Sequence, residues 1–333
     1  MTGDGVITRE PAWKNAMYTE NAMYTEKDAD QVLTKTIAEQ YLADDEATNL
    51  NEFTRIEENA AECLRKHNDT LELNGLVRLS DAAAESLGKH EGCLKLNGLY
   101  NLSDQAAASL GNHSGYALEL NGIQQLSEAA AEQLGKHPNL ALNGLKSLPN
   151  AVADGLCRSK KGNSLELNGV MSLSNKAALI LAEDERLNLS LSGIAELSDE
   201  AAQSLSKHGG LLKLNGLRSL SDAAAESFSS HEGEAICLDG IKTISDAAAK
   251  SLSQYERDLS LDGLTNLTDA AAKSFSNHNG HKLSLMGVTR LSDTAAANLA
   301  NRKGWLFLDG LTTLSKTARE RLTKNKGISF PRR

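Results

Sequence analysis

Two hydrophobic patterns with different periods alternate along most of the chain. The first is a short alternation, as in Leu71–Leu73, where an apolar, a polar and an apolar residue follow one another as in a half-buried strand. The second places Ala83, Ala84 and Leu87 on one face of a helix. Ser80, just before this helix, is a good helix cap. The pattern predicts a strand, a turn, a short helix and a second turn.

This pair of patterns recurs at nearly constant spacing, which indicates an internal repeat. A glycine in the turn after each strand marks the units, and we call these the anchor glycines. They are Gly75, Gly98, Gly122, Gly144, Gly169, Gly193, Gly216, Gly240, Gly263, Gly287 and Gly310. Successive anchors are 22 to 25 residues apart, so the chain holds eleven full units. We expect each anchor to be glycine because the turn needs a backbone angle that a Cβ would resist.

The units must stack to be stable. Each has only about three to four extended residues, too few to hold a sheet alone. Stacked units give a parallel sheet with right-handed crossovers and helices on one side. Strands stack about 4.8 Å apart, whereas neighbouring helices need about 8–9 Å. The predicted fold class is therefore an α/β, right-handed βα solenoid, a horseshoe with its parallel sheet concave and its short helices convex.

The unit L-x-L-N-G-L-x-x-L-S-D-x-A-A-x-x-L resembles the repeats of leucine-rich repeat proteins. The L-x-L strand and the nearby asparagine carry the resemblance, which covers residues 48–330. Asn74 and its equivalents follow the second leucine directly, and the unit looks like a bacterial variant of the class. This position leaves open whether the asparagines form the buried ladder of the family or face the concave surface. The resemblance implies recognition of proteins or other ligands on the concave face, without catalysis.

The chain divides into four parts. Residues 1–27 are predicted to be a flexible N-terminal arm, and residues 28–47 an N-terminal capping helix over 28–43. Residues 48–326 hold about twelve βα repeats, because a degenerate unit with Glu52 in the anchor place precedes the eleven full ones. Residues 327–333 form a C-terminal edge strand and cap. The arm contains a duplication, Asn15–Glu20 and Asn21–Glu26, which is either loosely packed or a short docking peptide.

Composition narrows the possible functions. Lys and Arg number 35 against 44 Asp and Glu, giving a net charge of −9, so no nucleic-acid partner is expected. Basic residues gather from Lys316 to Arg333, which we interpret as a polar end cap, with a small anion or nucleic-acid site as the alternative. No apolar run is long enough for a signal peptide or a membrane span. We expect a cytoplasmic protein with no membrane partner, either monomeric or weakly self-associating.

A histidine series is the most conspicuous candidate for chemistry. His67, His90, His113, His137, His208, His231 and His278 share one position after the helix. Carbonyls at the end of each helix explain them, and the helix spacing of about 8–9 Å is too wide for two rings to share an ion. The cysteines are widely spaced, and no nucleotide, metalloprotease or serine-hydrolase motif is present. We expect no catalytic residue, no cofactor and no metal.

Binding is better judged from the outward-facing strand position, three residues before each anchor glycine. Its first half is charged and mostly acidic, and its second half is small and neutral and ends at Phe307. Trp305 lies two residues earlier and points to the same face. Two large rings there are typical of an interface hot spot, unless residues 326–333 fold over them. The candidate partner-binding residues are Glu72, Lys95, Glu119, Glu166, Lys213, Trp305 and Phe307.

These features favour a non-catalytic scaffold that recognises a partner protein on its concave face. Two other interpretations stay open. In one, the N-terminal arm or an end of the solenoid links copies of the chain into a structural assembly. In the other, the chain is a regulatory subunit that inhibits an enzyme by engulfing it with its acidic half.

Overall fold

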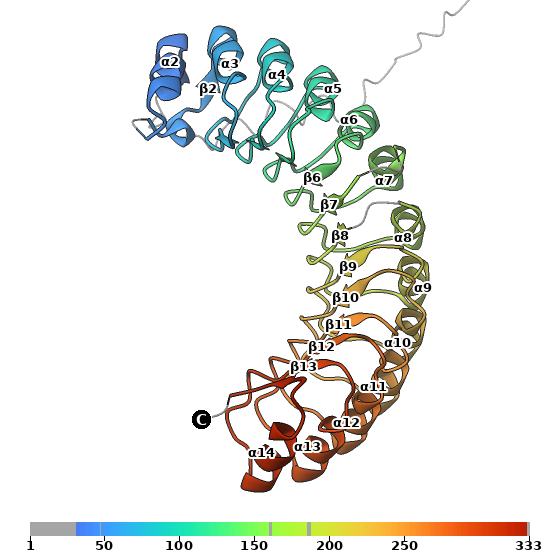
Figure 1. Ribbon diagram of the computed structural model, residues 1–333. Coiled ribbons are helices and arrows are strands. Elements are labelled where there is room, and N and C mark those ends of the chain that lie inside the picture. The colour runs from blue at the N-terminus through green and yellow to red at the C-terminus, as the bar shows by residue number, and fades with distance from the viewer. Residues whose placement is uncertain (1–30, 47, 160–161, 185–187, 332–333) are drawn as a thin grey trace, which may run out of the picture.

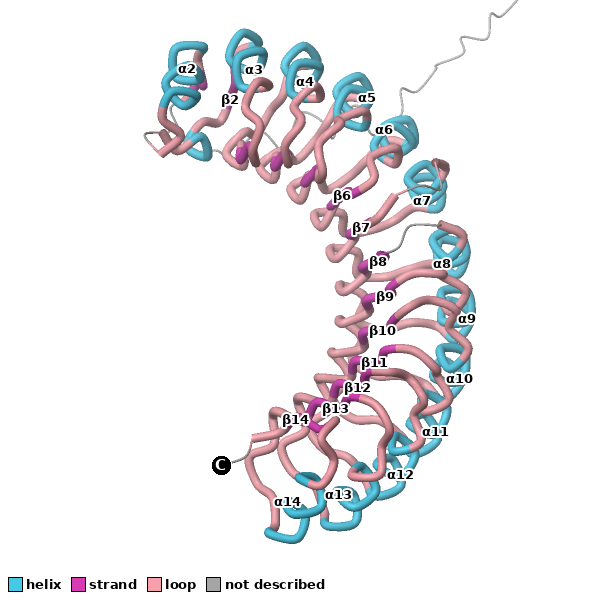
Figure 2. Tube along the Cα trace, in the orientation of Figure 1, coloured by secondary structure: helices cyan, strands magenta, loops and turns pink. Residues whose placement is uncertain are grey.

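The computed structural model describes residues 31–46, 48–159, 162–184 and 188–331. Over these residues the chain is a curved, open solenoid with one strand on the inner side and one helix on the outer side of most turns (Figure 1). Figure 2 shows the strands following one another along the inner wall. The predicted α/β solenoid, with a concave parallel sheet and convex helices, is confirmed.

Twelve parallel strands form the inner sheet, each paired with its neighbours in chain order. They are β3 Leu71–Glu72, β4 Leu94–Lys95, β5 Leu118–Glu119, β6 Asn139–Ala141, β7 Ser164–Glu166, β8 Asn188–Ser190, β9 Leu211–Lys213, β10 Ala235–Cys237, β11 Asp258–Ser260, β12 Lys282–Ser284, β13 Trp305–Phe307 and β14 Ile328–Ser329. The eleven full units supply β3 to β13, and β14 is the additional strand that the sequence predicts at the C-terminal end.

The helices stack on the outer side of the sheet. They are α2 Lys35–Ala43, α3 Glu58–Leu64, α4 Asp81–Leu87, α5 Asp104–Gly111, α6 Glu128–Leu134, α7 Asn150–Cys157, α8 Asn175–Ala182, α9 Asp199–Leu205, α10 Asp222–Ser229, α11 Asp246–Leu252, α12 Asp269–Ser276, α13 Asp293–Leu299 and α14 Lys316–Thr323. The core between helices and sheet is built from leucine and alanine. Ala83, Ala84 and Leu87 of α4, for example, are fully buried. The small alanines let the helices lie close to the sheet.

The N-terminal end differs from the expected helix over 28–43. The helix begins only at Lys35, and Val32–Leu33 instead form β1, which pairs in parallel with β2, Arg55–Ile56. A 3-10 turn, η1 Leu50–Glu52, takes the place of a strand in the degenerate unit, so the inner sheet starts at β3. The carbonyl of Gln31 holds this extended segment by accepting from the Thr54 amide at 2.9 Å. The rest of the expected helix and the arm lie outside the described residues.

The anchor glycines are required by close approach between units, so the expectation of a special backbone angle was wrong. Among the described glycines only Gly162, at φ 149°, lies in the left-handed region. A Cβ on Gly98 would stand 2.2 Å from the carbonyl oxygen of Asn74 and 2.7 Å from that of Leu76. Both carbonyls belong to the preceding unit. The stacking distance between successive turns therefore excludes any side chain at this position.

Hydrogen bonds at the helix starts join each unit to the next. As predicted, Ser80 Oγ caps its helix by accepting from the Ala83 amide at 3.2 Å. The aspartate after the cap has a second role besides its charge. Asp104 Oδ1, for example, accepts from the cap hydroxyl of the following unit, Ser127 Oγ, at 2.5 Å. Each such serine thus receives a bond from its own helix and donates one to the unit before it.

Substituting an anchor glycine should separate two units. We expect Gly98→Ala to lower the free energy of unfolding by about 1–3 kcal/mol, because the new methyl group overlaps a carbonyl that cannot move without shifting the stack. Gly209→Ala is the matched control, since nothing lies within 4 Å of a Cβ added there. It should change the free energy by less than about 0.5 kcal/mol. Urea unfolding followed by circular dichroism measures both, and equal midpoints would show that the turns are not tightly stacked.

Candidate protein-binding surface

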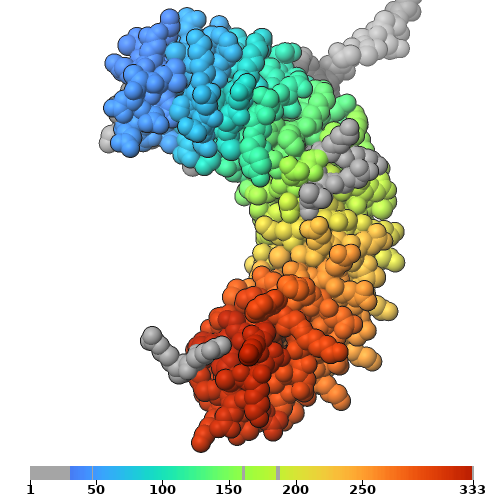
Figure 3. Space-filling view, viewed as in Figure 1, coloured from blue at the N-terminus to red at the C-terminus, as the bar shows by residue number. Residues whose placement is uncertain are grey.

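The outward-facing strand residues form one continuous row on the concave face of the sheet. Strand pairing places each member directly opposite the next, about 4.8 Å away. From the N-terminal end the row reads Glu72, Lys95, Glu119, Ala141, Glu166, Ser190, Lys213, Cys237, Ser260, Ser284, Phe307 and Ser329. We call this the concave row. Figure 3 shows the hollowed side of the curved body on which it lies.

A second row of polar side chains, which we call the asparagine ladder, occupies the residue before each anchor glycine. Asn51 Oδ1 accepts from the Asn74 amide at 2.8 Å, and Asn74 Oδ1 accepts from the Asn97 amide at 3.2 Å. The bonds continue through Asn121, Asn143 and Asn168 to Ser192, and again from Asn215 through Asp239 and Asp262 to Met286. The asparagines therefore form a ladder between units, although most remain half-buried at the edge of the concave face.

Side chains of the ladder form hydrogen bonds with several members of the concave row. Asn97 Nδ2 donates to Glu119 Oε2 of the following unit at 3.0 Å. Where the ladder residue is Asp239, the next row residue is Ser260, whose hydroxyl donates to the aspartate at 2.6 Å. The same pairings occur at Asn143–Glu166, Asp262–Ser284 and Asp309–Ser329. Donor and acceptor are matched at these five steps, and at Asn168 the amide oxygen accepts from Ser190 Oγ at 2.7 Å, so part of the polar character of the row comes from the stacking of the units.

Two charged members of the row neutralise each other. Lys95 Nζ lies 2.8 Å from Glu72 Oε1, and this hydrogen bond lowers the pKa of Glu72 and raises the pKa of Lys95. Within the described part of the chain, no ion pair forms at Glu119, Glu166 or Lys213. These three side chains retain charge that a partner could meet.

The small Ala141 leaves a hollow in the row between the two unpaired glutamates. It measures about 300 Å³ and is lined by Glu119, Glu166, Tyr116 and Asn139. Tyr116 is 73% exposed at this place. Asn139 Nδ2 donates to the Tyr116 carbonyl at 2.7 Å, which holds the start of the strand. A side chain entering the hollow would lie between two carboxylates and beside an aromatic ring.

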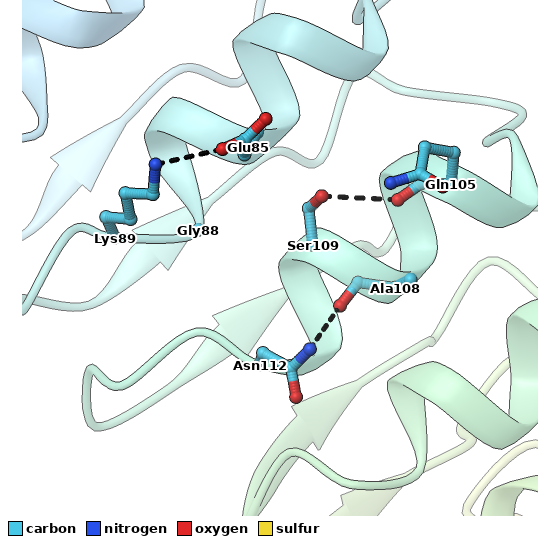
Figure 4. A pocket seen from close by; sticks show the side chains of 7 residues that line it. All are labelled: Glu85, Gly88, Lys89, Gln105, Ala108, Ser109 and Asn112. Carbon is cyan, nitrogen blue, oxygen red and sulfur yellow. Dashed lines mark hydrogen bonds and ion pairs between the residues drawn. The ribbon is translucent and has the colours of Figure 1, made fainter.

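The convex side offers a hollow of similar size with no comparable chemistry. Figure 4 shows the groove between α4 and α5, which measures about 290 Å³. Lys89 Nζ is bonded to Glu85 at 3.0 Å, and the side chains of Ser109 and Asn112 donate to carbonyls of their own helix. These polar groups are already satisfied within single helices, so we do not assign a site there.

The C-terminal end of the concave row departs from the rest of the array. Trp305 is 49% exposed, and Phe307 is half-buried beside it. Met286, 44% exposed, occupies the ladder position that faces Phe307. Lys282 Nζ lies 5.0 Å from the centre of the Phe307 ring. We call these four residues the C-terminal patch. Strand β14 extends the sheet beside β13 and leaves Trp305 exposed.

Sequence reasoning found Trp305 and Phe307 but missed Met286. The residue before the anchor glycine is Asn or Asp in nine of the eleven units, and only Ser192 and Met286 differ. Reading that column alone would have identified the methionine. Because its side chain has no Oδ1, the ladder stops there and cannot reach Asp309 of the following unit.

The histidines belong to a column that includes every unit, fifteen residues after the anchor place. The column contains His67, His90, His113, His137, Ser159, Asp184, His208, His231, Tyr255, His278, Arg302 and Asn325. The first four rings stack, with centroids 6.4, 6.0 and 5.3 Å apart in chain order. The expected spacing of 8–9 Å was wrong, because the rings lie beyond the helix ends, between the widely spaced helices and the closely spaced strands.

The side chains of His231 and Arg302 bond to the preceding unit and not to the end of their own helix, whereas His137 Nδ1 lies 2.9 Å from the Asn139 carbonyl of its own loop. His231 lies 3.0 Å from the carbonyl of Ser206 and 3.2 Å from that of Gly210. Arg302 donates to the Gly280 carbonyl at 2.7 Å. The column is thus another link between units. No group of three metal-ligating side chains is found among the described residues.

Burial keeps three histidine rings of the column uncharged at neutral pH. It lowers the pKa of His113, His208 and His278 to about 4, and repulsion from His137 and His90 acts in the same direction on His113. In the unfolded chain these rings take up a proton near their ordinary value of 6.5. Between pH 6.5 and pH 4 the unfolded state therefore binds more protons. The stability present above pH 6.5 is lost as the pH falls through this window.

Acid should accordingly destabilise the array through the buried rings. We expect the thermal midpoint to fall as the pH is lowered from 6.5 to 5, with each lowered ring contributing up to about 1.4 kcal/mol per pH unit. His113→Gln should reduce this dependence, whereas Gln in place of the exposed His281 should leave it unchanged. Melting curves over this range measure the slopes. If the thermal midpoint depends on pH with the same slope in both variants, the histidine column is not the cause of the acid sensitivity.

Comparison with known proteins gives likenesses of architecture only. No family model and no curated protein matches the chain. An internalin (inlF) from Listeria monocytogenes is 15% identical with a TM-score of 0.45, covering 88% of this chain and 93% of that one. The Toll–Spatzle complex of Drosophila is 14% identical with a TM-score of 0.44, covering 73% of this chain and 42% of that one. The Rad7–Elc1 complex of yeast is 14% identical with a TM-score of 0.38, covering 90% of this chain and 87% of that one.

The regular strand–helix repeat of the chain itself fits a leucine-rich repeat protein. Among the described residues, no helix has the length and apolar character that crossing a membrane requires.

Proposed function

We propose that the chain is a non-catalytic protein-recognition scaffold that binds a partner protein on its concave face. The observation that carries the proposal is the C-terminal patch, where Met286, Trp305 and Phe307 present apolar surface at one end of a polar row. Aromatic side chains in such a setting supply most of the binding energy in protein interfaces.

Folding alone does not account for this patch. Nine other units carry Asn or Asp where Met286 stands, and a hydrogen bond of that kind contributes about 0.5–1.5 kcal/mol. Methionine at this position cannot form the hydrogen bond, and it also exposes an apolar side chain to water. Both effects act against stability, which supports a role in binding.

The acidic half of the concave row supports a second point of contact. Glu119 and Glu166 flank the hollow above Ala141 and form no ion pair with the described residues. A lysine or arginine of the partner would enter between them. The proposed contact residues are Glu72, Lys95, Glu119, Glu166, Lys213, Trp305 and Phe307, to which we add Met286.

Capture from a lysate of the source cells tests the proposal. We expect a protein retained by the immobilised chain to be lost with the Trp305→Ala/Phe307→Ala variant, with affinity weakened at least about 30-fold. Leu179→Ala is the matched control, because it removes an apolar side chain that is 44% exposed on α8 of the convex side. Circular dichroism of both variants checks that they are folded.

The opposite pattern would contradict the proposal. A partner that is kept by the double variant and lost with Leu179→Ala would place recognition on the convex helices.

A further inference from the structure

The C-terminal patch combines apolar surface with a cation that lacks a counterion. Within the described residues Lys282 forms no ion pair. Asp258 Oδ1 accepts from the Lys282 backbone amide at 3.0 Å, and Asp262 Oδ1 accepts from Ser284 Oγ at 2.6 Å and from the Met286 amide at 2.9 Å, but neither carboxylate forms an ion pair with the Lys282 side chain. The patch therefore suits a segment that presents an aromatic ring and a carboxylate side by side.

The chain itself carries such a segment twice. The duplicated hexapeptide Asn-Ala-Met-Tyr-Thr-Glu occupies Asn15–Glu20 and Asn21–Glu26, which lie outside the described residues. In an extended peptide, residues two apart share a face and are separated by about 7 Å. Tyr18 and Glu20 would then point the same way, as would Tyr24 and Glu26. In that arrangement the ring would meet the patch while the carboxylate met Lys282.

We propose that the C-terminal patch binds the hexapeptide duplication of a second copy of this chain. The inference rests on the proposed function in one respect, because it assigns a ligand to one end of the same concave face. Charge supports the assignment. Residues 15–26 contain two glutamates and no basic residue, whereas Lys282 of the patch is exposed and lies 5.0 Å from the centre of the Phe307 ring.

The length of the arm favours a second copy over the same chain. From Gln31 back to Tyr24 an extended chain spans at most about 24 Å. The sheet runs ten strand steps from β3 to β13, which is about 48 Å along the concave face. The nearer hexapeptide cannot follow the sheet to its own patch. A neighbouring molecule imposes no such limit.

Binding of this kind would join chains head to tail. The arm of one chain would occupy the patch of the next, leaving a free arm at one end and a free patch at the other, so that the series stays open and its mass grows with concentration. Two hexapeptides in each arm raise the local concentration of ligand without adding a contact.

Peptide titration tests the recognition step. The chain has two tryptophans, so Trp13→Phe in the full chain leaves Trp305 as the only reporter. Adding a synthetic peptide of residues 15–26 should change Trp305 emission in a saturable way. A peptide with both tyrosines replaced by serine should bind at least tenfold more weakly.

A consensus variant separates binding from folding. Met286→Asn with Phe307→Ser restores the residues that other units carry at these places, including a ladder oxygen for the Asp309 amide. We expect this variant, made in the Trp13→Phe chain, to have an equal or higher thermal midpoint. Its affinity for the peptide should be at least tenfold weaker. Equal binding by the variant and its parent would overturn the proposal.

Sedimentation velocity tests the assembly step. The weight-average mass of the full chain should rise with concentration. The mass of the consensus variant and of Tyr18→Ser/Tyr24→Ser should stay at the monomer value. If the peptide binds while the mass of the full chain stays at the monomer value, the arm occupies the patch of its own chain, and the second-copy assignment is overturned. If the peptide fails to bind although lysate capture still depends on Trp305 and Phe307, this inference falls and recognition of another protein stands.

Discussion

Successive units of this protein meet at the turn after each strand, and they approach more closely there than a Cβ allows. The carbonyl of Asn74 stands where the first side-chain atom of any other residue at Gly98 would be. The amide beside that turn donates to the Oδ1 of the unit before it. Strands of only two or three residues form few hydrogen bonds with their neighbours, so these turns, the helix caps and the histidine column supply the links that the sheet lacks. The horseshoe follows from that spacing, because the helices on the outer side need more room than the turns on the inner side.

The same contact determines how freely the concave surface can vary. Asn97 and Asn143 each donate to a glutamate of the next unit, whereas Asp239, Asp262 and Asp309 each accept from a serine, so the row keeps a bonded pair at these steps. Part of its polarity therefore arises from stacking. At Met286 and Phe307 both members of the pair change together, and no hydrogen bond can replace the one that is lost. The patch is thus the place where this array departs most clearly from what its own packing favours, which is a physical reason to assign binding there.

Sequence periodicity was sufficient for the features that lie within one unit. The strand at Leu71, the cap at Ser80 and the buried face of the following helix each follow from residues a few positions apart. Features that depend on contacts between units were harder to foresee. The role of the anchor glycines, the stacking of the histidines at 5.3–6.4 Å and the ladder all join residues more than twenty positions apart in the chain. The short strand at Val32 was missed for a related reason, since its partner Arg55 lies in the degenerate unit.

Amide hydrogen exchange along the ladder, measured by NMR on the full chain, shows whether side-chain oxygens of one unit hold the turn of the next. It also shows whether this hold is released where the ladder residue changes. We expect slow exchange at the amides of Asn74 and Asn97, which donate to an Oδ1 of the unit before them. Exchange should be faster at Asn215 and Asp309, which follow Ser192 and Met286. Equal protection of the Asp309 and Asn97 amides would contradict this expectation, because the methionine at position 286 would then have removed no hydrogen bond between units.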